Sequence, residues 1–74
     1  MKNIETLIDE GGDISIGPVA GLTCVAAATD GYNCLAMRVR RDGEKLNVLM
    51  KRLDKAIGLA WSDDVFTDEV NGPA

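Results

Sequence analysis

The clearest pattern of apolar and polar positions runs over residues 44–61, EKLNVLMKRLDKAIGLAW. At about 100° per residue, eight of its apolar side chains fall on one arc of about 140°, and no polar residue lies inside that arc. We therefore predict an amphipathic helix that begins at Asp42 or Gly43, with Leu53 buried at the centre of the arc. The arc comprises Leu46, Leu49, Met50, Leu53, Ala56, Ile57, Ala60 and Trp61. The alternative, in which Asp42-Gly43 is a hairpin turn and residues 45–50 form a strand, explains less of this pattern.

Two apolar segments of strand length, residues 22–29 and 33–41, flank the dipeptide Asp30-Gly31. This dipeptide is a strong signal for the turn of a β-hairpin. A loop of two or four residues keeps the apolar side chains of both strands on one face, whereas an odd-numbered loop sets apolar residues opposite arginines. We therefore predict an even-numbered loop; with two residues, it pairs Leu22 with Val39, Cys24 with Met37, and Ala26 with Leu35. The apolar face predicted to lie under the long helix comprises Leu22, Cys24, Leu35, Met37 and Val39.

Shorter elements precede and follow this pair. Residues 4–8 have helical spacing, and we expect Asn3 to cap that helix and Gly11-Gly12 to end it. Residues 13–16 alternate like an edge strand, which Gly17-Pro18 stops or bends. The tail is expected to form an edge strand or to pack loosely over residues 62–70, and to fray over 71–74.

These elements predict one domain, residues 1–74, of the α+β class. Its two layers are a short N-terminal helix, an antiparallel sheet of two to three strands, and the long amphipathic helix packed across the sheet. A chain of 74 residues buries only about 60% of its unfolded surface, so its core is small and oligomerisation is a common remedy.

The two cysteines are the most obvious reactive groups. In any hairpin with an even-numbered loop, Cys24 and Cys34 point to opposite faces of the sheet. They can therefore neither form a disulfide with each other nor share a metal ion. We expect Cys24 to be a small core residue, Cys34 to lie on the opposite face, and both thiols to stay reduced.

Other residue types that carry catalysis are scarce. The chain has no histidine, the commonest general base and metal ligand. Asp63 and Asp64 are adjacent acids without a predicted pocket around them, and the GPVAG turn lacks the lysine of a phosphate-binding loop. We expect a chain that is not an enzyme, with no catalytic residues, no metal and no cofactor. No apolar segment approaches the ~20 residues of a membrane span, and the N-terminus carries acids where a signal peptide is apolar, so we expect a cytoplasmic protein.

Charge is segregated along the chain. Residues 38–55 carry seven bases against three acids, whereas both flanks are acidic and the formal net charge is −4. A nucleic-acid surface would use the basic segment, but a pI near 4.5 and the scarcity of aromatic residues weigh against it. Its candidate contacts are Arg38, Arg40, Arg41, Lys45, Lys51 and Lys55.

Several apolar residues are predicted to lie outside the core. On the helical wheel Val48 and Leu59 lie about 160° away from the core arc, with Arg52 and Lys55 beside them. The outer face of the hairpin is also apolar. The candidate interface comprises Val25, Ala27, Ala36, Val48, Arg52 and Leu59. In so small a chain these residues favour a protein partner, either a second copy in a homodimer or a host protein.

The runs IDEGGDISIGPVAG and VRRDGEKLNVLMKRLDKAIG resemble those of short, uncharacterised proteins of temperate phages and prophages, over most of residues 4–60. The resemblance implies a bacterial or phage cytoplasmic accessory protein and brings no catalytic residues with it. Our leading hypothesis is therefore a non-enzymatic protein-interaction module that self-associates or binds a host protein, and nucleic-acid binding is the alternative.

Overall fold

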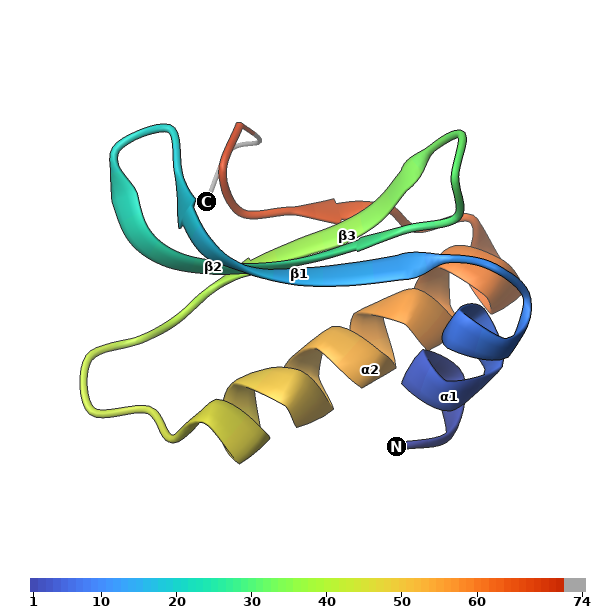
Figure 1. Ribbon diagram of the computed structural model, residues 1–74, viewed down its shortest axis with the longest axis horizontal. Helices are drawn as coiled ribbons and strands as arrows, with labels where there is room; N and C mark the ends of the chain where they lie inside the picture. The colour runs from blue at the N-terminus through green and yellow to red at the C-terminus, as the bar shows by residue number, and fades with distance from the viewer. Residues whose placement is uncertain (72–74) are drawn as a thin grey trace.

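The chain folds into two layers, a four-stranded sheet with both helices packed against one of its faces (Figure 1). The computed structural model describes residues 1–71. The elements are α1 (Lys2–Asp9), β1 (Asp13–Val19), β2 (Leu22–Thr29), β3 (Cys34–Val39), α2 (Leu46–Asp63) and β4 (Thr67–Asp68). The strand order is β1-β2-β3-β4; the first three strands are antiparallel and β4 pairs in parallel with β3. The predicted α+β class is confirmed, but the sheet is mixed and has more strands than expected.

The long helix α2 supplies most of the core. Leu53 lies at its centre with no exposed surface, as predicted. The helix begins at Leu46 and not at Asp42 or Gly43, because Gly43 adopts a φ of +74° that a right-handed helix excludes. The two ends of the predicted arc, Leu46 and Trp61, are exposed. Its buried residues are Leu49, Leu53, Ala56, Ile57 and Ala60.

The β2–β3 hairpin has the predicted even-numbered loop but not the predicted strand pairing. Thr29 pairs with Cys34 across a four-residue loop, in which the Asp30 carboxylate accepts hydrogen bonds from two backbone N–H groups, those of Tyr32 (2.9 Å) and Asn33 (2.7 Å). A β-bulge then shifts the register by one residue. The observed pairs beyond it are Ala28 with Ala36, Ala27 with Met37, Ala26 with Arg38, and Val25 with Val39.

This bulge changes which residues face the helices. Because Leu35 is the extra residue of the bulge, Leu35 and Ala36 are both buried in the core, although they are adjacent in the strand. The predicted pairing of Ala26 with Leu35 is therefore wrong, as are the other two predicted pairs. Met37 and Val39 lie on the face turned away from α2, and Ala36, predicted to lie on that outer face, is in the core.

The short helix α1 docks on α2 through a polar junction. Asn3 was predicted to cap α1, but it lies within the helix, and its side chain donates a hydrogen bond to the Asp54 carbonyl of α2 (3.0 Å). The Asp54 carboxylate accepts the N–H of Ile4 (2.8 Å), so the free N-terminus of α1 is capped from the neighbouring helix. This contact places Leu7 of α1 in the core.

The two edges of the sheet differ. β1 is an edge strand, as predicted, but it passes through Gly17-Pro18 by means of an irregularity in the pairing and does not end there. At the other edge the tail contributes β4, so of the two alternatives given for the tail, an edge strand or loose packing, the structure has the edge strand. The segment expected to fray, residues 71–74, lies outside the described residues from 72 onward.

Candidate functional site

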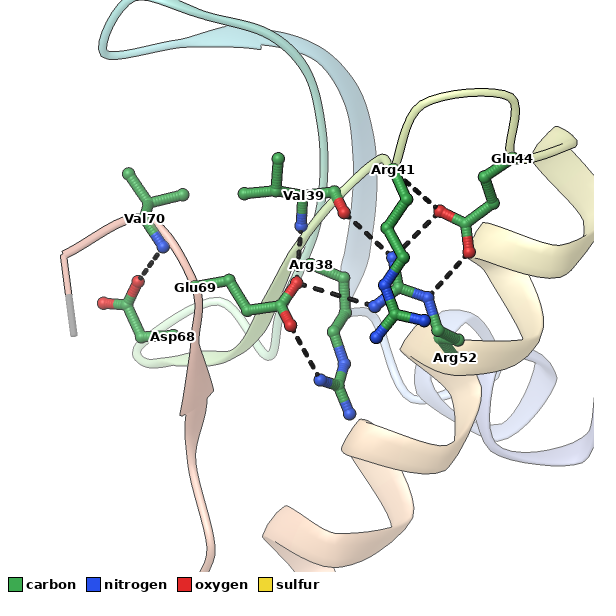
Figure 2. Close-up of polar contacts among 8 residues, drawn as sticks. All are labelled: Arg38, Val39, Arg41, Glu44, Arg52, Asp68, Glu69 and Val70. Carbon is green, nitrogen blue, oxygen red and sulfur yellow. Dashed lines mark hydrogen bonds and ion pairs between the residues drawn. The ribbon is translucent and has the colours of Figure 1, made fainter. Parts of the chain in front are cut away.

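A network of ion pairs joins β3, the C-terminal segment and α2 (Figure 2). Glu69 accepts the Val39 N–H (2.8 Å) through one carboxylate oxygen and contacts Arg38 Nη1 (3.0 Å) through the other. Arg52 of α2 reaches the same carboxylate at 3.6 Å and donates to the Val39 carbonyl (2.8 Å). The network therefore fixes the chain on both sides of Val39.

Arg52 also holds the loop that precedes its own helix. Its Nε and Nη2 donate to the two carboxylate oxygens of Glu44 at 2.7 and 2.9 Å, and the Arg41 N–H donates to the same carboxylate at 3.0 Å. The hydrogen bonds from Arg52, followed by that from the Arg41 backbone, lower the pKa of Glu44 to about 2. The carboxylate in turn raises the pKa of Arg52. Paired carboxylate–guanidinium geometry of this kind is strong and directional.

These ion pairs limit the access of a partner to two predicted contact residues, Arg38 and Arg52. Arg38 and Arg52 have only 20% and 16% of their side chains exposed, and both are paired with carboxylates. Burial raises the pKa of Glu69, but the Val39 N–H and Arg38 together lower it below its usual value. The network is therefore suited to fixing the fold, and neither arginine is free to contact a ligand without breaking it.

The other candidate nucleic-acid contacts are exposed. Arg40 donates from Nε to the Glu44 carbonyl (2.7 Å), and it lines an open pocket together with the next residue, Arg41. The remaining lining residues are Thr23, Cys24, Asp42 and Gly43. Lys45 lies at the start of α2, and Lys51 and Lys55 lie on its solvent side.

The predicted interface is divided between the core and the surface. Val25 and Ala36 are 1% exposed, so neither is accessible to a partner. Ala27 and Leu59 are half-buried, and Val48 is exposed on α2. The interface therefore stays a prediction for Ala27, Val48 and Leu59, which remain accessible.

Sequence reasoning missed the exposure of the aromatic side chains. The chain has one tryptophan, one tyrosine and one phenylalanine, and all three are outside the core: Trp61 is 42% exposed, Phe66 56% and Tyr32 96%. Trp61 was assigned to the core arc because helical periodicity does not show where the sheet beneath a helix ends. Phe66 lies in an acidic tail, and this position among acids was the only sequence feature that indicated its exposure.

Trp61, Val65 and Phe66 gather where α2 ends, and we call them the aromatic end. Asp64 terminates the helix in the left-handed conformation (φ +54°), and the Val65 N–H donates back to the Leu59 carbonyl (3.3 Å). This turn directs the chain out of the helix, and Val65 and Phe66 remain exposed. Asp63 and Asp64 are exposed beside them.

Among the described residues, the thiols and acids form no recognisable chemical centre. Both cysteines are free; Cys24 packs against the core, as predicted, and Cys34 is an exposed residue. Partial burial of its sulfur and the nearby Asp68 carboxylate raise the pKa of Cys34, which disfavours the reactive thiolate. Within residues 1–71, no group of three or more potential ligands (histidine, cysteine, aspartate or glutamate) is placed to hold a metal ion. The same residues contain no helix long and apolar enough to cross a membrane.

No protein-family model, no curated protein and no solved structure matches the chain. Its function is therefore inferred from its own surfaces.

Proposed function

We propose that the chain is a non-enzymatic protein-interaction module that binds its partner through the aromatic end. The observation that carries the proposal is the exposure of every aromatic side chain in a chain with very few of them. Two of these three, Trp61 and Phe66, lie within six positions of each other at one end of α2.

The placement is unusual on energetic grounds. An aromatic side chain buries about 150–250 Å² and dominates the energetics of cores and interfaces. A chain of this size has a small core, yet that core consists of leucine, isoleucine and alanine side chains. Tryptophan is among the residues most enriched at the centres of protein interfaces. Keeping both aromatic groups in water is consistent with a surface that is covered in a complex.

The proposal includes the setting that the sequence resemblance implies, a cytoplasmic accessory protein of phage or bacterial origin. Such a protein needs no reaction chemistry of its own, because it acts by occupying a partner's surface. Val48 and Leu59, two of the three residues of the predicted interface that remain accessible, are secondary to the aromatic end in this proposal.

A photo-crosslinking residue placed at Phe66 tests the proposal in the cells that encode the protein. We expect light to produce a covalent adduct with another polypeptide, because that side chain lies inside the binding surface. The matched control carries the same residue at Ile16, an exposed apolar position on the edge strand β1. An absence of adducts from position 66, or equal adducts from both positions, would refute the proposal, and the adduct's mass identifies the partner.

Nucleic-acid binding remains the second candidate, supported by the exposure of Arg40, Arg41, Lys45, Lys51 and Lys55. The pairing of Arg38 with Glu69 removes one of the six contacts. The formal net charge of −4 also opposes binding to a phosphate backbone.

A further inference from the structure

We propose that the partner of the aromatic end is the opposite end of a second copy of this chain, so that copies associate head to tail. This inference rests on the proposed function and names its partner. It starts from the length of α2: its 18 residues span about 27 Å at about 1.5 Å per residue, close to the molecule's longest extent of 30 Å. The two ends of α2 therefore lie at opposite ends of the molecule, as Figure 1 shows.

One end of the molecule combines apolar surface with negative charge. The aromatic end is flanked by Asp63 and Asp64, and the turn between α1 and β1 lies at the same end in Figure 1. That turn adds three exposed acids, Asp9, Glu10 and Asp13. A partner that covers the aromatic end must therefore bring positive charge to its rim.

The other end combines apolar surface with positive charge. Leu46 and Val48 are exposed in the first turn of α2, next to Lys45. Arg40 and Arg41 border the open pocket in the loop before the helix, where Asp42 is the exposed acid. We call Arg41, Lys45 and Leu46 the basic end. It offers the charge that the aromatic end lacks, together with apolar side chains of its own.

The same charges have an unfavourable order along α2. A helix favours acids near its N-terminus and bases near its C-terminus. In α2 the first turn contains no acid and follows Lys45, whereas the last turn contains Asp63 and no base. Both ends therefore oppose the helix dipole within one copy. A contact between the C-terminal end of one α2 and the N-terminal end of the next brings these unfavourable charges against their opposites.

The same charges disfavour a two-fold dimer held by its two aromatic ends, because that contact would bring two sets of acids together. An antiparallel two-fold dimer would pair each aromatic end with a basic end, but its size is fixed at two copies. A head-to-tail contact uses different surfaces on the two copies, so each copy keeps one free end. The assembly therefore grows into chains or closes into rings, and differs from the homodimer considered from the sequence.

Two blocked variants test the inference. Val65→Ser with Phe66→Ser removes the aromatic end, and Arg41→Gln with Leu46→Ser removes the basic end. All four positions are exposed, and the substitutions are neutral so that the two blocked ends cannot attract each other. We expect wild-type mass by light scattering to rise with concentration well above 7.9 kDa, whereas each variant alone stays at 7.9 kDa. An equimolar mixture should give a discrete heterodimer, because one intact end of each kind remains.

In the control, the basic-end variant is mixed with a second variant of the same end, which carries Lys45→Gln and Val48→Ser. This mixture should stay monomeric, because both variants lack an intact basic end. Circular dichroism establishes that each variant is folded; if one is not, the single changes Phe66→Ser and Leu46→Ser replace the double ones. A mixture that stays monomeric overturns the inference, as does a wild-type assembly that stops at a dimer. A monomeric wild type that crosslinks from Phe66 to a foreign protein refutes self-association but leaves the proposed function in place. Failure of both experiments refutes both.

Discussion

Replacing Leu53 with alanine should destabilise the chain severely, because this side chain lies at the centre of α2 with 0% of its surface exposed. It packs in a cluster that joins α2 to Ala26, Ala28 and Leu35 of the sheet and to Leu7 of α1. Truncating a buried leucine costs about 2–5 kcal/mol, from the lost transfer free energy and from the cavity left behind. The small alanines opposite Leu53 cannot extend to refill the space, so a loss of about 3 kcal/mol or more is expected.

That loss is large for a chain of 74 residues, whose total stability is expected to be about 4–11 kcal/mol at about 0.05–0.15 kcal/mol per residue. At about 4–8 °C per kcal/mol, the midpoint of thermal unfolding should fall by roughly 12–24 °C. The assay is a circular-dichroism melt at one fixed protein concentration, because self-association makes the midpoint depend on concentration.

The matched control is Ile16→Ala on β1, which lies outside both proposed contact ends. Ile16 is 45% exposed, so its truncation should change the free energy of unfolding by less than about 1 kcal/mol. A Leu53→Ala midpoint within about 2 °C of wild type, or an equal loss at both positions, would show that α2 packs through another face.

Three further predictions concern Gly12, the Glu44 carboxylate and the basic segment. Gly12→Ala should lower stability by about 1–3 kcal/mol, since its Cβ would lie 2.7 Å from the Thr29 carbonyl oxygen, while Gly17→Ala, with nothing within 4 Å, should melt like wild type. The ionised Glu44 carboxylate should stabilise the fold fully above its usual pKa of 4.5 and lose that contribution as pH falls toward about 2. The thermal unfolding midpoint of Glu44→Gln should therefore be lower than that of wild type at pH 7 and should converge with it near pH 2. Titration with labelled DNA or RNA at low salt should show no binding; affinity that falls steeply with added salt would instead favour the nucleic-acid hypothesis.

The elements of the fold were predictable where one pattern extended over many residues. The core arc of α2 covers four to five turns, so misplacing its start by a few residues left its buried face unchanged. The strand pairing depended on one residue. Nothing in the local composition marks Leu35 as a bulge, and one extra residue there exchanges the two faces for Met37 and Val39.

The surface was less predictable than the core, since exposure depends on neighbours that are distant in sequence. Val25 looked like an outward-facing strand residue, and it does point away from α2, yet it is buried. Arg52 and Glu69 are separated by 17 positions, and their contact depends on β4 returning beside β3. Helical periodicity placed Trp61 correctly on the arc of α2 but carried no information on the extent of the sheet beneath it.

Helix α2 determines how far apart the charges at its two ends lie in space. Residues 38–55 carry the excess of bases, and residues 56–74 carry four acids and no base. Glu69 of the acidic segment returns beside β3 and pairs with Arg38 and Arg52, so part of this charge is neutralised within one copy. A rigid helix that begins at Leu46 and ends at Asp63 keeps its two ends about 27 Å apart, well beyond the screening length of about 8 Å at physiological salt. The opposite charges at the two ends therefore cannot reach each other within one copy. Because exposed apolar side chains lie at both ends as well, contact with another molecule is the direct way to satisfy the charges and to remove the apolar surface from water.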